Sequence, residues 1–188
     1  MMNLFYEPLP DSIPVGGSDY KILTDFRDWL KFGDLLKDDA LKDVEKLDFM
    51  RNWFSDIPEV ITAEMFAGLR DFYTMSGLAS DQPGERKQDG LTRPPTFDWM
   101  IDAQYIIADF RRFYNMDLFR IEYLHWWEFF SLMKALPDES QLYRRTAIRS
   151  ADLSQINDPK RKRAVMEAQM RIAIPFEVDD FAIGAAFM

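Results

Sequence analysis

The sequence contains no cysteine, which excludes disulfide bonds and thiolate ligands for a metal ion. It contains one histidine, His125, whereas a zinc-protease helix needs two histidines and a ferritin-like di-iron site needs its Glu-x-x-His motif twice. No apolar run approaches the roughly 18 residues of a membrane span, and the first residues lack the basic and apolar regions of a signal peptide. We therefore expect a soluble protein of a reducing, intracellular compartment.

Three common enzyme motifs are missing as well. The chain has no Gly-x-Ser-x-Gly, no phosphate-binding Gly-x-x-x-x-Gly-Lys and no dinucleotide-binding Gly-x-Gly-x-x-Gly. A hydrolase with paired carboxylates stays open, because Asp98 and Asp102 lie four residues apart with Asp109 nearby. Arg112 falls on the same side of the expected helix, so we interpret this side as a solvated, charged face.

The sequence is rich in apolar and acidic residues. Hydrophobic residues make up 47% of the chain and aromatic residues 15%, which is enough to build a folded core. The net charge of −9 is unevenly spread: residues 142–171 carry eight basic and three acidic side chains, or +5, whereas residues 1–141 carry −11. An acidic body argues against a dedicated nucleic-acid-binding protein, because phosphate contacts need a concentrated positive surface.

Hydrophobic periodicity predicts a mostly α protein: a single helical domain of about six or seven helices with a small N-terminal β-hairpin. The hairpin covers residues 13–22 and turns at two glycines. Helices are expected over residues 25–37, 41–54, 63–75, 98–114, 120–136, 140–149 and 159–174. Thr24, Thr62 and Asp158 are expected to cap three of these helices, and Pro159 takes the first helical position after Asp158.

The expected domain covers residues 1–175 and includes a flexible loop at 77–96, where three prolines and three glycines occur without periodicity. The parts on either side of this loop are short, so we prefer one domain to two. Residues 176–188 form a C-terminal tail that is either disordered or docked on a partner.

The densest aromatic stretch is EYLHWWEFF, residues 122–130. On a wheel for the expected helix 120–136, apolar side chains cover nearly the whole circle, which is typical of a buried central helix. We therefore interpret this stretch as core, with His125 held by a hydrogen bond; a weak metal site with Glu122 and Glu128 is the alternative. The side chains expected in the structural core are Trp29, Trp99, Phe110, Tyr123 and His125. We predict no catalytic, cofactor-binding or metal-binding residue.

Candidate partner-binding residues come from three segments. Cations at residues 160–163 crowd the first turn of a helix, where they oppose the macrodipole, so we expect them to contact an acidic protein surface, another part of this chain or phosphate. An ordinary exposed turn is the alternative. The aromatic helix and the apolar tail offer side chains for groove or strand binding. The candidates are Trp126, Trp127, Phe130, Lys160, Arg161, Lys162, Arg163, Phe176 and Phe181.

One short element carries a resemblance. The run YLHWW, Tyr123–Trp127, preceded by MDL at Met116–Leu118, resembles a signature of the bacteriophage gene-product-fifteen family. The stretches Thr24–Phe32, Phe97–Phe110 and Asp158–Arg163 support this resemblance. It extends from about residue 10 to residue 175 of the printed sequence.

The resemblance implies a role in building the tails of long-tailed phages and prophages, since family members are encoded among tail genes near the tape-measure gene. It implies an assembly chaperone without catalytic residues or cofactor, in the host bacterial cytoplasm. The implied partners are the tape-measure protein and other tail assembly proteins, with self-association open and no membrane or nucleic acid expected. A minor structural component of the virion tail is the first alternative, and a metal-dependent enzyme is the second.

Overall fold

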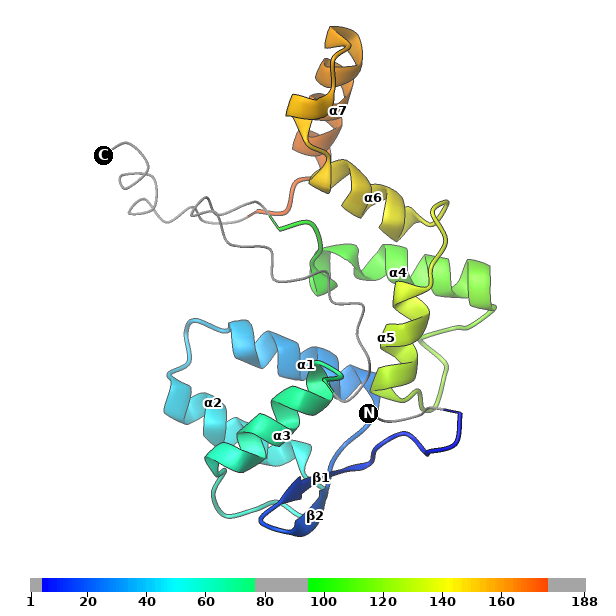
Figure 1. The fold of residues 1–188 in the computed structure, drawn as a ribbon. Coiled ribbons are helices and arrows are strands. Elements are labelled where there is room, and N and C mark those ends of the chain that lie inside the picture. The colour runs from blue at the N-terminus through cyan, green and yellow to red at the C-terminus, as the bar shows by residue number, and fades with distance from the viewer. Residues whose placement is uncertain (1–4, 77–94, 176–188) are drawn as a thin grey trace, which may run out of the picture. The chain divides into compact units, whose positions relative to one another are not determined.

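The computed structural model of the chain describes residues 5–76 and 95–175 (Figure 1). Within these residues it contains seven α-helices, two short 3-10 helices and one two-stranded sheet, which confirms the predicted fold class. The described residues fall into two compact units: unit 1 contains residues 5–76 and 121–132, and unit 2 contains residues 95–120 and 133–175. The single domain over residues 1–175 stays a prediction, and the predicted tail and most of the predicted loop lie outside the described residues.

Unit 1 contains the hairpin and four helices. They are β1 (Ser12–Val15), β2 (Ser18–Lys21), α1 (Phe26–Lys37), α2 (Asp43–Met50), the 3-10 helix η1 (Arg51–Trp53), α3 (Ala63–Tyr73) and the first seven residues of α5 (Trp126–Lys134). The predicted helix over residues 41–54 is thus correct in position, but its last turn tightens into a 3-10 helix.

The hairpin forms where the two glycines predict it. The strands are antiparallel, with Ile13 opposite Tyr20, and Gly16 and Gly17 adopt φ angles of +57° and +80°. Two successive positive φ angles match the right-handed twist of a hairpin and suit glycine best. β1 packs against α3 so closely that a Cβ on Gly68 would lie 2.8 Å from the Ile13 Cδ1 atom.

Large aromatic side chains fill the core of unit 1. α1 contributes Trp29 and Phe32, both with no exposed surface, and α5 contributes Trp126, which is 1% exposed. The Trp126 ring stacks on Tyr73 of α3 at 5.4 Å between centroids with nearly parallel planes. Because each buried aromatic ring removes a large apolar area from water, these contacts supply much of the stability of the unit.

The start of α5 corrects the sequence analysis, which placed it at residue 120. Residues 124–126 instead run antiparallel to residues 24–26, and the amides of Phe26 and Trp126 donate backbone hydrogen bonds of 2.9 and 2.8 Å across this pair. These backbone groups are therefore satisfied by a distant segment and not by a helix turn. As a result, α5 begins only at Trp126.

The cap of α1 is a second correction. Asp25, and not Thr24, is the N-cap residue, and its carboxylate accepts the amide hydrogen of Arg27 at 3.0 Å. The Thr24 hydroxyl is bonded to the Tyr123 hydroxyl at 2.8 Å instead. Aspartate is at least as good an N-cap as threonine, so the local signal does not separate the two residues.

Unit 2 is built from helices alone. They are α4 (Trp99–Tyr114), α6 (Gln141–Ser150), the 3-10 helix η2 (Leu153–Gln155) and α7 (Pro159–Ile172), together with the last two residues of α5. α6 lies against both α4 and α7. The predicted starts of α3, α4 and α7 are confirmed, because Thr62, Asp98 and Asp158 each accept amide hydrogens of the following turn.

Within residues 5–76 and 95–175, none of the helices combines the length and the apolar character that crossing a membrane requires.

Candidate partner-binding site

α7 is the most exposed helix of unit 2. It spans 14 residues and none of them is buried, although helices of folded domains normally bury one apolar face. Five basic residues and one glutamate give it a net charge of 5 − 1 = +4. Figure 1 shows α7, in orange, extending from the end of α6. A helix that its own unit covers so little is available to a partner.

The outer side of α7 combines cations with methionines. At 100° per residue, Arg163, Met166 and Met170 fall within about 60° of one another on the exposed side of α7, and Lys160 and Lys162 fall at the two edges of this side. Met166 is 38% exposed and Met170 is 70% exposed. Methionine is flexible and polarizable, so exposed methionines suit binding surfaces that adapt to their ligand. We call these five side chains the α7 surface.

Polar contacts hold the C-terminal half of α7 against α6. The Gln169 amide donates to the carbonyl oxygens of Ile148 and Ala151 at 2.9 and 2.8 Å, at the C-terminal end of α6. The Arg149 guanidinium donates from Nε to the Ile172 carbonyl at 2.7 Å. These carbonyls stand at or next to helix ends, and among the described residues only Ile148 of the three also accepts a backbone amide hydrogen, from Ala151. Both contacts therefore fix the direction of α7.

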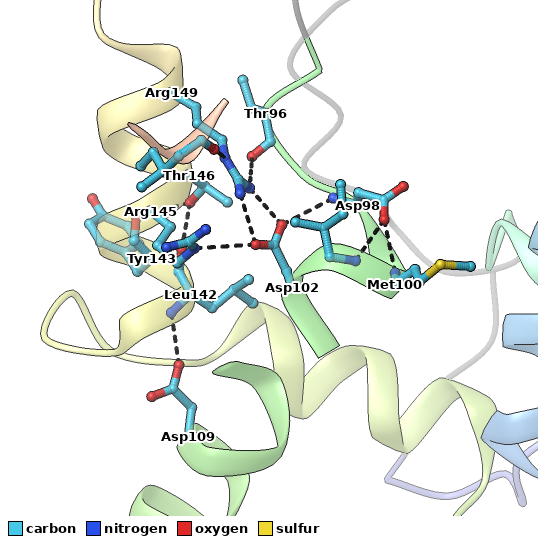
Figure 2. Close-up of polar contacts among 12 residues, drawn as sticks. Thr96, Asp98, Met100, Asp102, Asp109, Leu142, Tyr143, Arg145, Thr146 and Arg149 are labelled. Carbon is cyan, nitrogen blue, oxygen red and sulfur yellow. Dashed lines mark hydrogen bonds and ion pairs between the residues drawn. The ribbon is translucent and has the colours of Figure 1, made fainter. Parts of the chain in front are cut away.

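Arg149 is anchored in turn by Asp102 of α4, as Figure 2 shows. Its two terminal nitrogens donate to the two Asp102 carboxylate oxygens at 2.6 and 3.0 Å. One of them also donates to the Thr96 carbonyl at 3.1 Å. The Arg149 side chain is 3% exposed and Asp102 is not exposed at all. This bidentate, buried ion pair joins α4, α6 and the end of α7.

Asp102 accepts two further hydrogen bonds. The Arg145 Nε donates at 3.4 Å and the Asp98 amide at 3.1 Å (Figure 2). Burial alone would raise the pKa of Asp102, but the hydrogen bonds from Arg149, Asp98 and Arg145 and the positive charge of Arg149 hold it below its ordinary value. The carboxylate is therefore ionised at neutral pH with its oxygens occupied by donors.

The predicted solvated face of α4 is thus wrong. Asp102 is fully buried and Asp109 is 1% exposed. Asp109 accepts the amide hydrogens of Gln141 and Leu142 at 3.0 and 2.8 Å, and so caps the N-terminus of α6. The paired-carboxylate hydrolase loses its basis, since these acids are bonded to arginines and helix amides.

A groove lies at the foot of α7, within unit 2. It has a volume of about 620 Å³, which lies within the range of small-ligand pockets. Met170, Ala173 and Leu153 give it apolar walls, and Thr96 and Gln169 add polar groups. Because Met170 belongs to both the groove and the α7 surface, an apolar side chain of a partner lying along α7 can enter the groove.

The aromatic candidates are placed differently from the basic ones. Trp126 and Trp127 are 1% and 5% exposed, and their indole N–H groups donate to backbone carbonyls of α3 at 3.0 and 2.9 Å. Phe130 is half-buried beside Trp126. The structure corrects the prediction that the two tryptophans contact a partner, because both are packed and hydrogen-bonded inside unit 1. Phe176 and Phe181 lie outside the described residues.

The expected core residues are buried with two exceptions. Trp29, Phe110 and His125 are buried. Tyr123 is 53% exposed, because it precedes α5 instead of lying within it. Trp99 is half-buried at the start of α4, with its ring edge-on to Phe97 at 4.6 Å. Both exceptions follow from positions at helix starts, where a helical wheel does not describe the direction of a side chain.

His125 has two defined hydrogen bonds. Its Nδ1 accepts the Trp127 amide hydrogen at 3.1 Å, so Nε2 carries the proton and donates to the Pro10 carbonyl at 3.0 Å. Burial lowers the pKa of His125, although the Pro10 carbonyl and the charges of Glu128 and Asp11 act in the opposite direction. Within residues 5–76 and 95–175, no three His, Cys, Asp or Glu side chains gather in a way that could hold a metal ion.

In the comparison with protein-family models, the model described as Bacteriophage Gp15 protein matches residues 5–174. The chain belongs to this family. No curated protein and no solved structure matches it. The family is the one that the YLHWW element indicated, so the expected phage origin is confirmed.

In this member of the Bacteriophage Gp15 family, the YLHWW element is a structural signature. Residues 124–126 pair with residues 24–26, His125 donates to the Pro10 carbonyl, and Trp126 begins α5. The element thus joins three segments of unit 1 that lie far apart in the sequence. Four of its five side chains, Leu124 to Trp127, are buried.

Sequence reasoning missed the arginines that support α7. Arg145 and Arg149 lie four residues apart and share one side of α6 with Leu142, which is buried. Two cations aligned with a buried leucine indicate a buried acidic partner. Met166 and Met170 were missed too, although their spacing of four on a basic helix was visible in the sequence.

Proposed function

We propose that the chain acts in phage tail assembly as a chaperone, which holds a helical segment of the tape-measure protein or of another tail subunit before the tube polymerises. The observation that carries this proposal is α7, a basic helix without a buried residue that presents Met166 and Met170 beside a groove. Family membership supports the phage context, and the resemblance to the gene-product-fifteen family implies the tail.

The proposed mode is helix against helix. The partner helix lies along the α7 surface, places an apolar side chain in the groove and pairs its acidic side chains with Lys160, Lys162 and Arg163. One helix of 14 residues is about 21 Å long at about 1.5 Å per residue. It makes an interface at or below the usual range of about 1,200–2,000 Å². Such an interface is reversible, which suits a partner that must be handed over.

The proposed activity is therefore binding, without catalysis and without a cofactor, in the cytoplasm of the host bacterium. The buried ion pair between Asp102 and Arg149 keeps α7 in the direction that this binding needs. Exposed methionines allow the same surface to accept partner helices of different sequence.

Co-expression with the tape-measure protein encoded nearby tests the proposal. The expected result is that the tape-measure protein stays soluble with the wild-type chain and precipitates without it. Met170→Asp should abolish this protection, because it places a charge at the centre of the apolar part of the α7 surface. Met100→Asp is the matched control, since Met100 is 81% exposed on α4 and lies outside the α7 surface. Equal loss with both variants, or none with either, contradicts the proposed site.

Mass spectrometry of mature particles separates a chaperone from a tail component. A chaperone is released during assembly, so we expect purified virions to lack this chain. If the chain is present in a fixed ratio to the tail proteins, it is a minor structural component, and α7 then holds it in place permanently.

A further inference from the structure

A second exposed surface lies on unit 1, around α2. α2 buries only Met50 of its eight residues, and in Figure 1 it lies at the edge of its unit. Arg51 joins its C-terminal end to the following segment, because the guanidinium donates to the Asp48 carboxylate at 3.0 Å and to the Pro58 carbonyl at 2.6 Å. Apart from Met50 and Phe54, the residues 38–60 are exposed or half-buried, and we call this stretch the α2 surface.

The α2 surface is apolar and acidic. Five of its side chains are exposed large hydrophobic residues: Val44 (77%), Leu47 (36%), Phe49 (49%), Ile57 (60%) and Val60 (70%). Residues 38–60 also contain seven acidic and three basic side chains, a net charge of 3 − 7 = −4. Val44 and Leu47 share one side of α2. Exposed apolar side chains this frequent within one short stretch mark a candidate interaction surface, and the surrounding acids select a basic partner.

The chain itself contains a helix with the matching chemistry. α7 carries +4, exposes two methionines and lacks a buried residue. We propose that the α7 surface of one copy binds the α2 surface of a second copy, so that the chain self-associates head to tail. Methionine side chains pack against Val44 and Val60, while Lys160 and Lys162 pair with the acids around them. This proposal does not depend on the tail-assembly function.

The arrangement has a consequence for assembly size. The two surfaces differ, so each contact leaves one free α7 surface and one free α2 surface at the ends of a pair. Heterologous contacts of this kind either close into a ring or continue as an open chain of copies. Because one short helix provides the contact and charges contribute to it, we expect association at micromolar concentration that salt weakens.

Charge reversal on either surface tests the proposal without disturbing the core. Lys160→Glu with Lys162→Glu reverses two charges and removes the net charge of α7 (4 − 4 = 0), and acidic residues at a helix start favour the macrodipole. Asp39→Lys with Glu59→Lys reverses two exposed charges and removes the net charge of residues 38–60 (4 − 4 = 0). The matched controls make the same charge changes at exposed positions outside both surfaces: Arg112→Glu with Arg144→Glu, and Asp19→Lys with Glu122→Lys. Thermal unfolding followed by circular dichroism confirms that each variant is folded.

Sedimentation and light scattering give the outcome. Wild-type protein should exceed the chain mass of 22.2 kDa and should approach it on dilution. The same decrease should follow when salt rises from about 0.1 M to about 1 M, which shortens the screening length from about 10 Å to about 3 Å. Each reversed variant alone should bind itself at least about tenfold more weakly, or about 1.4 kcal/mol, while both controls behave like wild type.

Mixing the two reversed variants decides whether the contact joins different copies. The α2-surface variant keeps its α7 surface (+4) and the α7-surface variant keeps its α2 surface (−4), so an equimolar mixture should form pairs that contain one copy of each variant. Three results overturn the proposal: a monomeric wild type across this concentration range, a mixture that stays monomeric, and controls that lose association as much as the reversed variants. The first of these is also the result expected if α7 binds α2 within one chain.

Discussion

Arg149 is the single residue with the widest structural role in unit 2. Its guanidinium contacts Asp102 of α4, the Thr96 carbonyl and the last carbonyl of α7 at the same time (Figure 2). A buried ion pair adds little net stability, because desolvation offsets the attraction of the charges. Removing one partner is different, since the other charge then stays buried and unpaired.

Arg149→Met should therefore lower the free energy of unfolding by about 3–5 kcal/mol. Arg163→Met is the control: Arg163 pairs with Glu167 on the exposed side of α7, so its loss should cost about 0–1 kcal/mol. Urea unfolding measures both. Adding Asp102→Leu to Arg149→Met should recover much of the loss, because it removes the buried carboxylate that Arg149→Met leaves without its main partner, while Arg145 loses only a contact of 3.4 Å. A double variant less stable than the single one contradicts this account.

His125 should make stability depend on pH. Its pKa in the folded chain is lowered by burial, while the unfolded chain keeps the ordinary value of about 6.5. As the pH falls through about 6.5, the unfolded state takes up a proton that the folded state resists, so the free energy of unfolding falls. His125→Gln should flatten this part of the curve. Urea midpoints between pH 8 and pH 5.5 test it, and an equal slope in the variant would exclude His125 as the cause.

At the scale of the element, the sequence predicts those helix boundaries whose cause lies within a few residues of the boundary. Thr62, Asp98 and Asp158 start their helices because an N-cap and the turn it caps lie within four residues. α5 is different: its expected start at residue 120 is wrong because residues 124–126 pair with residues 24–26, about 100 positions away. Periodicity within a window contains no information about such a partner.

Contacts between residues far apart in the sequence also explain why part of the candidate site was predicted wrongly. The charged side of α4 was predicted to be solvated because Arg145 and Arg149, which pair with Asp102 on this side, lie more than 40 residues later in the sequence. Lys160–Arg163 are exposed, and their assignment to a partner, which rests on the local signal of cations that oppose the macrodipole, stays a prediction. Trp126 and Trp127 were assigned to a partner although the aromatic density itself indicated core.

At the scale of the whole molecule, unit 1 is built from two separate parts of the chain. Residues 121–132 complete a unit that otherwise consists of residues 5–76. They supply Trp126, Trp127 and Phe129, each no more than 5% exposed. Burying one such side chain stabilises a fold by about 1.5–3 kcal/mol, and a whole domain has only about 5–15 kcal/mol.

A fragment of residues 1–82 should therefore be unfolded, because it lacks three of the large side chains of its core. Joining residues 121–134 to its end through a flexible Gly-Ser linker should restore a cooperative transition. Circular dichroism during heating and the dispersion of amide signals in NMR spectra measure both. A fragment of residues 1–82 that unfolds cooperatively by itself would show that α5 is dispensable for unit 1.

The same arrangement determines how the protein is made. The ribosome adds 132 − 82 = 50 residues between the end of the first part of unit 1 and the last residue that completes it. At about 5–20 residues per second, this takes about 2.5–10 s. During that interval the nascent chain cannot cover Phe26 and Phe72 with the side chains of α5. Apolar surface thus stays open to aggregation while the chain is being made, and slower synthesis at low temperature lengthens this exposure.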